Sequence, residues 1–510
     1  MVLDTIARED EGLRLERSKA FRRVVRDIRH PQDADVEADV PQSLEKVLRD
    51  YQVTGFNWLN SLAHYGLGGI LADDMGLGKT LQVLAFLLAN RDGRRAPSLV
   101  IAPTSLVYNW LDEAEKFTPE LKAKVIAGTK AEREALLAET GTECDVLVTT
   151  YNMLLRDIAL YEKRTFRYVF LDEAQHIKNP STKAAHAVKK LKASDYFALT
   201  GTPIENTLTE LWSLFDFLMP GYLLNHNSFK ARYEVPIVKE ENERAMKNLQ
   251  RHVMPFILRR LKRDVLTELP DKVERRMACE MTPKQEKVYR AWFLQSQKEF
   301  RDALKEHGVD GSRLKILAIL TRLRQIACDP SLFLEDYDGG SGKLDMLEEV
   351  VSDAIEAGHR MLIFSQFTTM LAHIGDRLRK ANVDYLYLDG STPPMERLRL
   401  VKEFNAGRGA AFLISLKAGG TGLNLTGADM VIHFDPWWNP AVEDQATDRA
   451  YRLGQQSNVQ VLKFITKDTI EEKIYQLQEK KKSLIDHMIQ PGENFLSKLT
   501  NEEIAALFEK

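Results

Sequence analysis

The stretch GILADDMGLGKT, residues 69–80, is the part of the sequence from which the rest can be interpreted. Its apolar start (69–72) predicts a buried strand, MGLG (75–78) predicts a tight turn, and the following LQVLAFLLA (81–89) predicts a helix. A strand, a glycine-rich turn, a lysine, a hydroxyl residue and a helix, in that order, predict a phosphate-binding loop. Glycines let backbone N–H groups surround phosphates, and the N-terminus of the helix adds positive potential.

The side chains of this loop suit a triphosphate. Lys79 can neutralise phosphate charge, and the hydroxyl of Thr80 can ligate Mg²⁺. The generic pattern begins with a glycine at position 73, where this chain has Asp73. A plain glycine turn before a helix is the alternative, but GLGKT directly after a strand favours a nucleotide site. The residues expected to contact the nucleotide here are Asp74, Met75, Gly76, Leu77, Gly78, Lys79 and Thr80.

Composition bounds the class of protein. The chain has 510 residues, 44% hydrophobic and 28% charged, which is typical of a globular protein with two or more domains. The net charge of −3 gives no general sign of a nucleic-acid partner, so any such site must be a local patch. Cys144, Cys279 and Cys328 lie far apart and are expected to be reduced core thiols of a cytoplasmic protein. No signal peptide and no apolar run long enough to cross a membrane is visible, so membrane insertion is not expected.

Strands alternate with helical stretches after the loop. The strand candidates are 98–103, 144–151, 167–174 and 195–203. They contain few polar residues, which predicts a parallel sheet covered by helices on both faces. Ligands of such sheets bind at the carboxyl ends of the strands, where Lys79, Thr150, Asp172, Glu173 and Thr200 are expected.

The acidic pair in VFLDEAQ is the second strong signal. Asp172 and Glu173 directly follow an apolar strand, about 90 residues after the phosphate loop. A solvated turn is the alternative, but in this position Walker-B chemistry is favoured. Asp172 would hold Mg²⁺ through water, and Glu173 would orient and deprotonate the attacking water.

Residues 204–340 interrupt the alternation. The segments 208–221 and 242–262 look helical, and Thr282 opens a long helix that a turn at 306–312 separates from another helix. We interpret the region as a helical insertion between two α/β units. The basic cluster Arg259, Arg260, Lys262 and Arg263 leaves two alternatives open, a phosphate contact and a charged helix face.

A second alternation begins at Ser341, with no second phosphate-binding loop. Its strand candidates are 360–367, 383–391, 410–416, 428–435 and 458–465. The glycine-rich loop 415–429 follows one of them and suits the close approach of a backbone or a phosphate. Further on, Gln445 is followed by Arg449 and Arg452, which a helix would place on one face.

At this point the residues resemble a family, the SWI/SNF-class helicase-like ATPases of the second helicase superfamily. The similar motifs run in family order over about residues 46–490: LRDYQ, LADDMGLGKT, APTSLVYNW, TTY, LDEAQHIKN, LTGTPIEN, SGKLDML, IFSQF, SLKAGGTGLNLT and DPWWNPAVEDQATDRAYRLGQ. DDMGLGKT together with DRAYRLGQ is the specific combination. Gln175 stands where relatives commonly have a histidine, and His176 follows it.

The resemblance implies two tandem RecA-like lobes, built from parallel sheets flanked by helices, with ATP and Mg²⁺ between them and double-stranded DNA across the top. It implies an N-terminal segment and linker (1–45), a first lobe (46–275), a helical insertion (276–340), a second lobe (341–490) and a tail (491–510). It also implies a bacterial-type motor core that is monomeric, cytoplasmic and associated with the nucleoid. Its activity would be DNA-stimulated ATP hydrolysis that drives translocation along duplex DNA and remodels DNA-bound protein complexes.

The resemblance also implies site residues. Gln52 would contact adenine, although a helix cap is its other interpretation. Gln175 and Gln445 would also contact the nucleotide, and Arg449 and Arg452 would complete the catalytic set with Lys79, Asp172 and Glu173. The residues expected to contact DNA are Thr104, Asn109, Thr150, Gln366, Lys417, Gly420, Thr421 and Trp438.

Some alternatives stay open on the sequence. Trp438 can stack on a base or pack in a core. Within the motor class, an RNA-polymerase-associated or strand-separating motor is the alternative to a duplex translocase. From another class, a nucleotide-gated module could bind DNA without sustained turnover, although the presence of Glu173 and both arginines argues against it.

Overall fold

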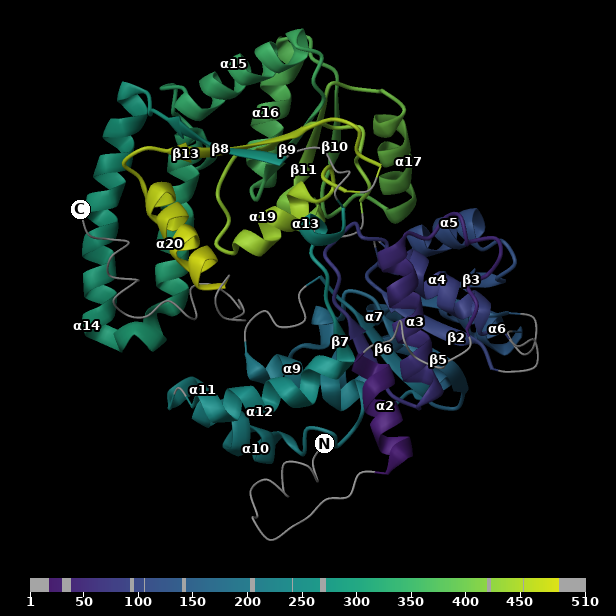
Figure 1. The fold of residues 1–510 in the computed structure, drawn as a ribbon. Helices are drawn as coiled ribbons and strands as arrows, with labels where there is room; N and C mark the ends of the chain where they lie inside the picture. Colours follow the sequence, from purple (N-terminus) through teal and green to yellow (C-terminus); the bar gives the residue numbers. More distant parts are fainter. Residues whose placement is uncertain are drawn as a thin grey trace. The chain divides into compact units, whose positions relative to one another are not determined.

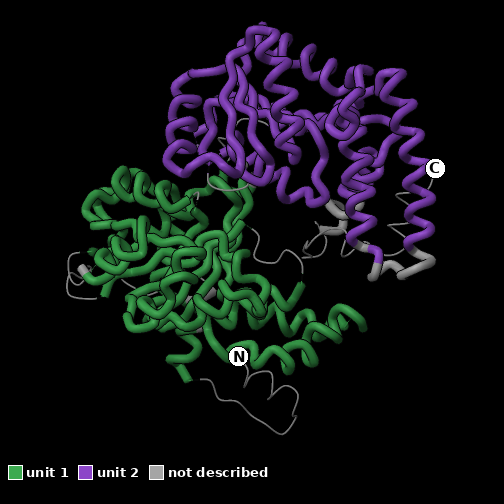
Figure 2. The backbone as a smooth tube through the Cα atoms, turned by 180° about the vertical axis from the view of Figure 1, so that it is seen from behind, with its two compact units in different colours: residues 1–267 green, residues 268–510 purple. Residues whose placement is uncertain are grey.

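Two parallel sheets organise the computed structural model of this chain (Figure 1). The structure describes residues 18–29, 38–91, 96–104, 106–139, 144–201, 207–240, 242–266, 272–419, 423–452 and 454–485. The chain divides into two compact units, residues 1–267 and residues 268–510 (Figure 2). The predicted fold class, two α/β units with parallel sheets flanked by helices, is confirmed.

The first unit contains a seven-stranded sheet with the strand order β3-β4-β2-β5-β6-β1-β7. Its strands are β1 (Gly69–Leu71), β2 (Ser98–Ala102), β3 (Ala123–Val125), β4 (Val146–Thr150), β5 (Thr165–Leu171), β6 (Lys192–Leu199) and β7 (Ile257–Leu258). All pairings are parallel. Every residue of β1, β2 and β4 is buried, which requires cover on both faces of the sheet.

Helices supply that cover. The helices of the first unit are α2 (Lys19–Arg29), α3 (Asp50–His64), α4 (Lys79–Ala89), α5 (Val107–Phe117), α6 (Lys130–Glu139), α7 (Tyr151–Tyr161), α8 (Lys183–Val188), α9 (Leu208–Leu218), α10 (His226–Phe229), α11 (Val235–Lys239), α12 (Glu243–Val253) and α13 (Lys262–Val265). The segment 242–262 was expected to be helical throughout, but α12 ends at Val253 and Ile257–Leu258 pairs with β1 as strand β7.

The second unit contains a six-stranded parallel sheet with the strand order β10-β11-β9-β12-β13-β8. Its strands are β8 (Lys272–Cys279), β9 (Met361–Ser365), β10 (Tyr385–Leu388), β11 (Ala411–Ser415), β12 (Met430–His433) and β13 (Val459–Thr466). Met361 and Ile363 belong to one apolar cluster, whereas Leu362 and Phe364 belong to another. Alternate residues of one strand thus enter separate cores, so both faces of this sheet are covered.

The helices of the second unit are α14 (Pro283–Cys328), α15 (Gly342–Glu356), α16 (Thr368–Lys380), α17 (Pro394–Asn405), α18 (Leu416–Gly419), α19 (Pro440–Thr447) and α20 (Ile470–Ile485). Within the described residues, no helix is long and apolar enough to span a membrane. The three cysteines are buried and free, as expected for core thiols.

Strand β8 corrects the boundary between the predicted lobes. Residues 272–275 were assigned to the first lobe, but they pair with β13 along the edge of the second sheet. The sequence KVERRMAC hides this strand because most of its side chains are exposed, so it shows neither an apolar run nor a clear alternation. The region 276–340 is therefore an integral part of the second unit rather than an insertion between the units.

Element α14 folds back on itself. Gln285 Nε2 donates to the carbonyls of Ile326 (3.0 Å) and Ala327 (3.1 Å). A straight helix would separate residues 285 and 326 by about 62 Å. Ser312 Oγ also donates to the carbonyl of Ala303 (2.8 Å), so the chain reverses between residues 303 and 312, in agreement with the predicted turn. The two arms lie side by side in Figures 1 and 2.

A buried ion pair fixes α15 in the second unit. Lys343 Nζ lies 2.6 Å from Glu471 Oε2, and both side chains are completely inaccessible to solvent. Lys343 also donates to the carbonyl of Phe434 (2.8 Å). The proximity of the Glu471 carboxylate raises the pKa of Lys343 against the opposite effect of burial. Lys343 therefore stays charged in the core.

We predict that Lys343→Met destabilises the second unit by about 3–5 kcal/mol, because it leaves the Glu471 carboxylate buried without a counter-ion. Native-state hydrogen exchange of peptides from β9 and β12 measures this for the second unit separately. Lys284→Met is the matched control: Lys284 forms its ion pair with Asp338 at the surface, so its loss should leave exchange unchanged. Equal exchange in the two variants would contradict the prediction.

Candidate nucleotide-binding site

The predicted phosphate loop lies between β1 and α4. Gly76 and Gly78 have φ values of 85° and 74°, which favour glycine, and Gly78 directly precedes α4. A Cβ atom at Gly78 would also lie 2.5 Å from Gln52 Nε2. The backbone therefore has the left-handed turns that allow N–H groups to face a bound anion at the helix N-terminus.

Lys79 and Thr80 begin α4, and both are partly exposed. Lys79 Nζ donates to the carbonyls of Asp73 (2.5 Å) and Asp74 (3.4 Å). These bonds hold the ammonium group against the loop that is predicted to bind phosphate. Asp74, Met75 and Gly76 are also partly exposed, whereas Leu77 is buried.

Tyr51 and Gln52 of α3 form hydrogen bonds with the backbone of the predicted phosphate loop. Both Tyr51 Oη and Gln52 Nε2 donate to the carbonyl of Leu77, each at 3.1 Å. Gln52 Oε1 accepts from the backbone N–H of Arg49 (3.0 Å), which is the helix-cap interpretation left open by the sequence. Gln52 is 2% exposed, so its contact with adenine stays a prediction beside a structural role that is observed.

Asp172 and Glu173 follow β5, as predicted. Asp172 is buried, and its Oδ2 accepts from the indole N–H of Trp110 (2.8 Å) while Oδ1 accepts from the N–H of Glu173 (2.9 Å). The hydroxyl of Tyr151 donates to the carbonyl of Asp172 (2.9 Å). Trp110 and Tyr151 lie within quoted motifs, but no local pattern in the sequence indicated that they hold the acidic residue.

The pKa of the Asp172 carboxyl is raised to about 7. Burial is the main cause, and the neighbouring Glu173 carboxylate adds to it, while the Trp110 hydrogen bond and the charge of Lys79 lower the pKa. Between about pH 4 and pH 7, the Asp172 carboxyl therefore binds more protons in the folded state than in the unfolded chain. Accordingly this group makes the free energy of unfolding fall as pH rises through that interval.

Glu173 is connected to the end of the next strand. Gln175 Nε2 donates to Glu173 Oε2 (2.8 Å), and Thr200 Oγ1 donates to Gln175 Oε1 (3.1 Å). Glu173 itself has φ 48° and ψ 56°, a left-handed conformation that is strained for a residue with a Cβ. Gln175 was predicted to contact the nucleotide, and in the structure its amide orients Glu173.

The sheet brings these groups together. Strands β5, β6 and β1 are neighbours, and they end at Asp172, Thr200 and the phosphate loop. Two strand spacings separate the outer loops by only about 10 Å. The effect of Lys79 on the pKa of Asp172 is consistent with this proximity. A lysine, two carboxylates and a helix N-terminus at one edge can bind a metal–triphosphate and activate water.

The second unit holds the predicted arginines. They do not lie on one helix face as expected, because α19 ends at Thr447 and a turn carries Arg449 and Arg452. Arg449 is buried, and Arg452 Nη1 donates to the carbonyl of Leu423 (3.4 Å). Gln445 lies on α19 and is partly exposed. The roles of these three residues stay predictions.

The predicted DNA contacts of the first unit differ in accessibility. Thr104 is exposed and Asn109 is partly exposed. Thr150 is 4% exposed, and its hydroxyl caps α7 by accepting from the N–H of Met153 (3.1 Å). The strand–helix junction therefore uses the hydroxyl of Thr150, and the contact of this residue with DNA stays a prediction.

The residues of the second unit that were predicted to contact DNA also differ in solvent exposure. Lys417 is exposed, whereas Trp438 is 8% exposed and packs in the cluster with α14 and α20, so the core interpretation is the correct one. Gln366 Oε1 accepts from the buried Arg324 (2.9 Å), which lies 5.1 Å from the Trp438 ring. Gly420 and Thr421 lie outside the described residues.

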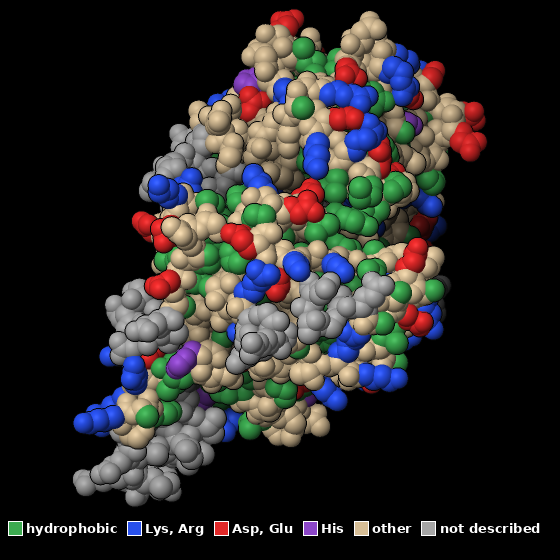
Figure 3. Space-filling view, turned by 90° about the vertical axis from the view of Figure 1, so that its right-hand side faces the viewer, with side chains coloured by type: hydrophobic (Ala, Val, Ile, Leu, Met, Phe, Trp, Pro, Cys, Tyr) green, Lys and Arg blue, Asp and Glu red, His purple; other side chains and the backbone are tan. Residues whose placement is uncertain are grey.

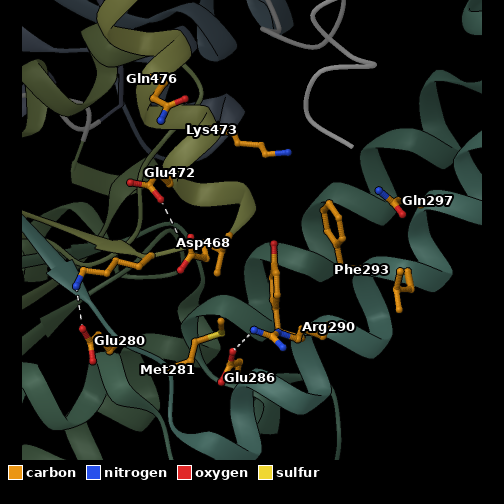
Figure 4. Close-up of a pocket in the computed structure, with 14 residues that line it drawn as sticks. Glu280, Met281, Glu286, Arg290, Phe293, Gln297, Asp468, Glu472, Lys473 and Gln476 are labelled. Carbon is orange, nitrogen blue, oxygen red and sulfur yellow. Dashed lines mark hydrogen bonds and ion pairs between the residues drawn. The ribbon is translucent and has the colours of Figure 1, made fainter. Parts of the chain in front are cut away.

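A cavity of about 1030 Å³ lies elsewhere in the second unit, between α14, α20 and the ends of β8 and β13. Phe293 and Arg290 of α14 face it from one side, and Lys473 and Gln476 of α20 from the other (Figure 4). None of the predicted site residues lines this cavity. Its size alone therefore says nothing about the nucleotide site.

Comparison with known proteins gives these motifs a family context. Residues 51–332 match the SNF2-related domain, and residues 342–454 match the helicase conserved C-terminal domain. A Bacillus subtilis protein named "Putative ATP-dependent helicase/translocase YwqA" is 40% identical over 98% of this chain and 54% of its own length. A Mycoplasma pneumoniae protein named "Uncharacterized ATP-dependent helicase" is 40% identical over 91% of this chain and 44% of its own. The chain spans about half the length of these curated relatives.

A solved structure, "Sulfolobus solfataricus SWI2/SNF2 ATPase core in complex with dsDNA", is 38% identical. The match covers 92% of this chain and 99% of that chain, with a TM-score of 0.45. This score is too low for the positions of individual residues to be compared, so the family rests on the sequence matches.

We predict opposite effects of two substitutions on the pKa of Asp172. Glu173→Gln removes a charge that raises this pKa and should lower it, whereas Lys79→Ala removes a charge that lowers it and should raise it further. Infrared difference spectra of the carboxyl group across pH 4–9 measure both shifts. Asp172→Asn is the control that assigns the band. Shifts in the same direction in both variants would contradict the electrostatic assignment.

Proposed function

The chain belongs to the SNF2-related family, and on this premise we propose that it hydrolyses ATP to translocate along double-stranded DNA. The observation that carries the proposal is the edge of the first sheet, where Lys79 lies within electrostatic reach of the Asp172–Glu173 pair. In this proposal Lys79 counters the charge of the triphosphate. Glu173, oriented by Gln175, accepts the proton of the attacking water.

Mg²⁺ fits the same residues, because the Asp172 carboxylate and the Thr80 hydroxyl are hard oxygen ligands. When bound, the ion would neutralise charge on the β- and γ-phosphates. Asp172 has to be ionised for this role. The Trp110 N–H and the Lys79 charge both lower the pKa of Asp172 and so favour its ionised form. Trp110 also fixes the position of the carboxylate through its hydrogen bond.

The proposal includes a role for the arginines of the second unit. An arginine that stabilises charge on the transferring phosphoryl group is worth on the order of 10³–10⁵ in rate. In the family pattern Arg449 and Arg452 have this role. Hydrolysis would then require both units, although the loop and the acidic pair belong to the first.

Double-stranded DNA is the proposed track. The support is the pairing of DDMGLGKT with DRAYRLGQ and the helicase or translocase names of the relatives. Acidic and basic side chains are interspersed on the face drawn in Figure 3. Thr104 and Lys417 are exposed at strand ends and suit phosphate contacts, which bind without reading sequence. Remodelling of DNA-bound protein complexes would follow from such movement.

Three substitutions should separate binding from hydrolysis. Lys79→Ala should abolish hydrolysis and weaken ATP binding, because the triphosphate loses its main counter-charge. Glu173→Gln and Arg452→Ala should keep ATP binding, with hydrolysis reduced by about 10²–10⁴-fold for the lost base and about 10³-fold or more for the lost arginine. Fluorescent-nucleotide binding and ATP turnover measure the two steps, with Lys247→Ala of the exposed α12 surface as the control. Near wild-type turnover in any of the three would contradict the role of that residue.

Duplex DNA should stimulate ATP turnover more than single-stranded DNA or RNA does. Affinity should fall steeply with salt because phosphates supply the contacts, and Lys417→Ala should reduce the salt slope by about one. Lys380→Ala at the exposed end of α16 is the control. Strand displacement would favour a strand-separating motor, and equal stimulation by RNA would favour an RNA-polymerase-associated motor. DNA binding without turnover would favour a nucleotide-gated module.

A further inference from the structure

Asp73, which replaces the first glycine of the generic phosphate loop, has a buried carboxylate with an unusual partner. Its side chain is completely inaccessible, so the charge needs compensation inside the protein. Arg260 supplies this compensation with two donors: Nε lies 2.8 Å from Oδ1, and Nη2 lies 2.5 Å from Oδ2. Gln82 Nε2 also donates to Oδ2 (3.1 Å). This two-point geometry is the strong form of an arginine–carboxylate pair.

The residues around Arg260 contact its guanidinium group from several sides. The side chain is 12% exposed and reaches the loop from 187 residues further along the chain. It donates to the carbonyl of Tyr51 and to Gln82 Oε1 (2.7 Å), and it lies 5.3 Å from the Tyr51 ring. A Cβ atom at Gly55 would lie 2.8 Å from Nη2 and 1.9 Å from Gln82 Oε1, so glycine is needed there.

The backbone of the same segment also holds the loop. The N–H of Ala72 donates to the carbonyl of Leu258 (2.7 Å), and the N–H of Asp74 donates to the carbonyl of Arg260 (3.0 Å). The N–H of Lys262 donates to Asp74 Oδ2 (3.0 Å). On the other side of Asp73, its carbonyl accepts from Lys79 Nζ. Asp73 thus links the lysine to the arginine.

We propose that Arg260 is a positioning residue of the nucleotide site, whose charge cancels that of Asp73 beside the bound triphosphate. This rests on the proposed function of the loop. Without Arg260, an uncompensated carboxylate next to the loop repels the phosphates of ATP. The basic cluster near residue 260 therefore provides, at Arg260, neither a DNA contact nor a charged helix face, the two interpretations left open by the sequence.

The test uses the full chain and Arg260→Gln. The uncompensated carboxylate acts on ground state and transition state alike, so the KM for ATP should rise at least 10-fold while kcat stays within about 3-fold. Loss of folded protein would instead lower kcat at constant KM. The Kd of a fluorescent ATP analogue, measured without DNA, should rise by the same factor as KM. An unchanged Kd in this variant would overturn the proposal.

Two more variants show whether ATP binding depends on the charge of Arg260 or on the shape of its guanidinium group. Arg260→Lys keeps the charge without the fork, and its Kd should stay within about 3-fold of wild type. The double variant Asp73→Asn/Arg260→Gln removes both charges and should also return to within about 3-fold. A double variant that binds at least 10-fold more weakly than wild type would overturn the proposal. This variant decides the question if Arg260→Gln alone does not fold, because it leaves no unpaired buried charge.

The controls separate this proposal from the proposed function. If the wild-type chain does not bind the ATP analogue, the proposed function fails. If Lys79→Ala binds the analogue more weakly than wild type while Arg260→Gln binds it like wild type, only the role of Arg260 fails.

Discussion

Parallel pairing of β5, β6 and β1 is the constraint on which the rest of the first unit depends. Because parallel strands end at one edge, Asp172, Thr200 and the phosphate loop meet although they are far apart in sequence. Chain connections then refine the geometry. Trp110 holds Asp172, and Gln175 joins Glu173 to Thr200. A change in any of these bonds moves a group within a site whose parts are only about 10 Å apart.

Most of the buried charges described above are paired with an opposite charge, but the Asp172–Glu173 pair is not, and this difference separates a site from a scaffold. In the second unit, Lys343 and Glu471 are both inaccessible and neutralise each other. In the first, two carboxylates adjoin each other, burial raises the pKa of Asp172 to about 7, and Glu173 has a strained backbone. A scaffold has no reason to keep such an arrangement, because a polar pair would be more stable. The proposed Mg²⁺ site does, because a bound ion would relieve the repulsion.

The sequence predicted what depends on local pattern. The glycine turn, Lys79, the acidic pair and the buried strands are each specified within about ten residues. Lys79 begins α4 and the acidic pair follows β5 as predicted, while their chemical roles stay predictions. Features that the predicted pattern does not reveal were missed. Strand β8 has few apolar residues, Trp110 meets Asp172 across 62 residues, and Thr150 is buried by its own helix cap. Arg449 and Arg452 were expected on a helix that ends before them, because helical spacing alone does not show where a helix stops.

Asp73 shows how a departure from a motif can indicate a contact. A carboxylate in a phosphate loop is unfavourable unless a cation neutralises it. Asp73 therefore indicates that a basic partner is present, but the sequence does not show which residue it is. In the structure this partner is Arg260. It lies in the last segment of the first unit, eight residues before the second unit begins at residue 268. Backbone bonds from Leu258 and Arg260, and the bond from Lys262 to Asp74, join this segment to the loop at successive points. The chain therefore cannot bend within residues 258–262 without breaking bonds to the loop.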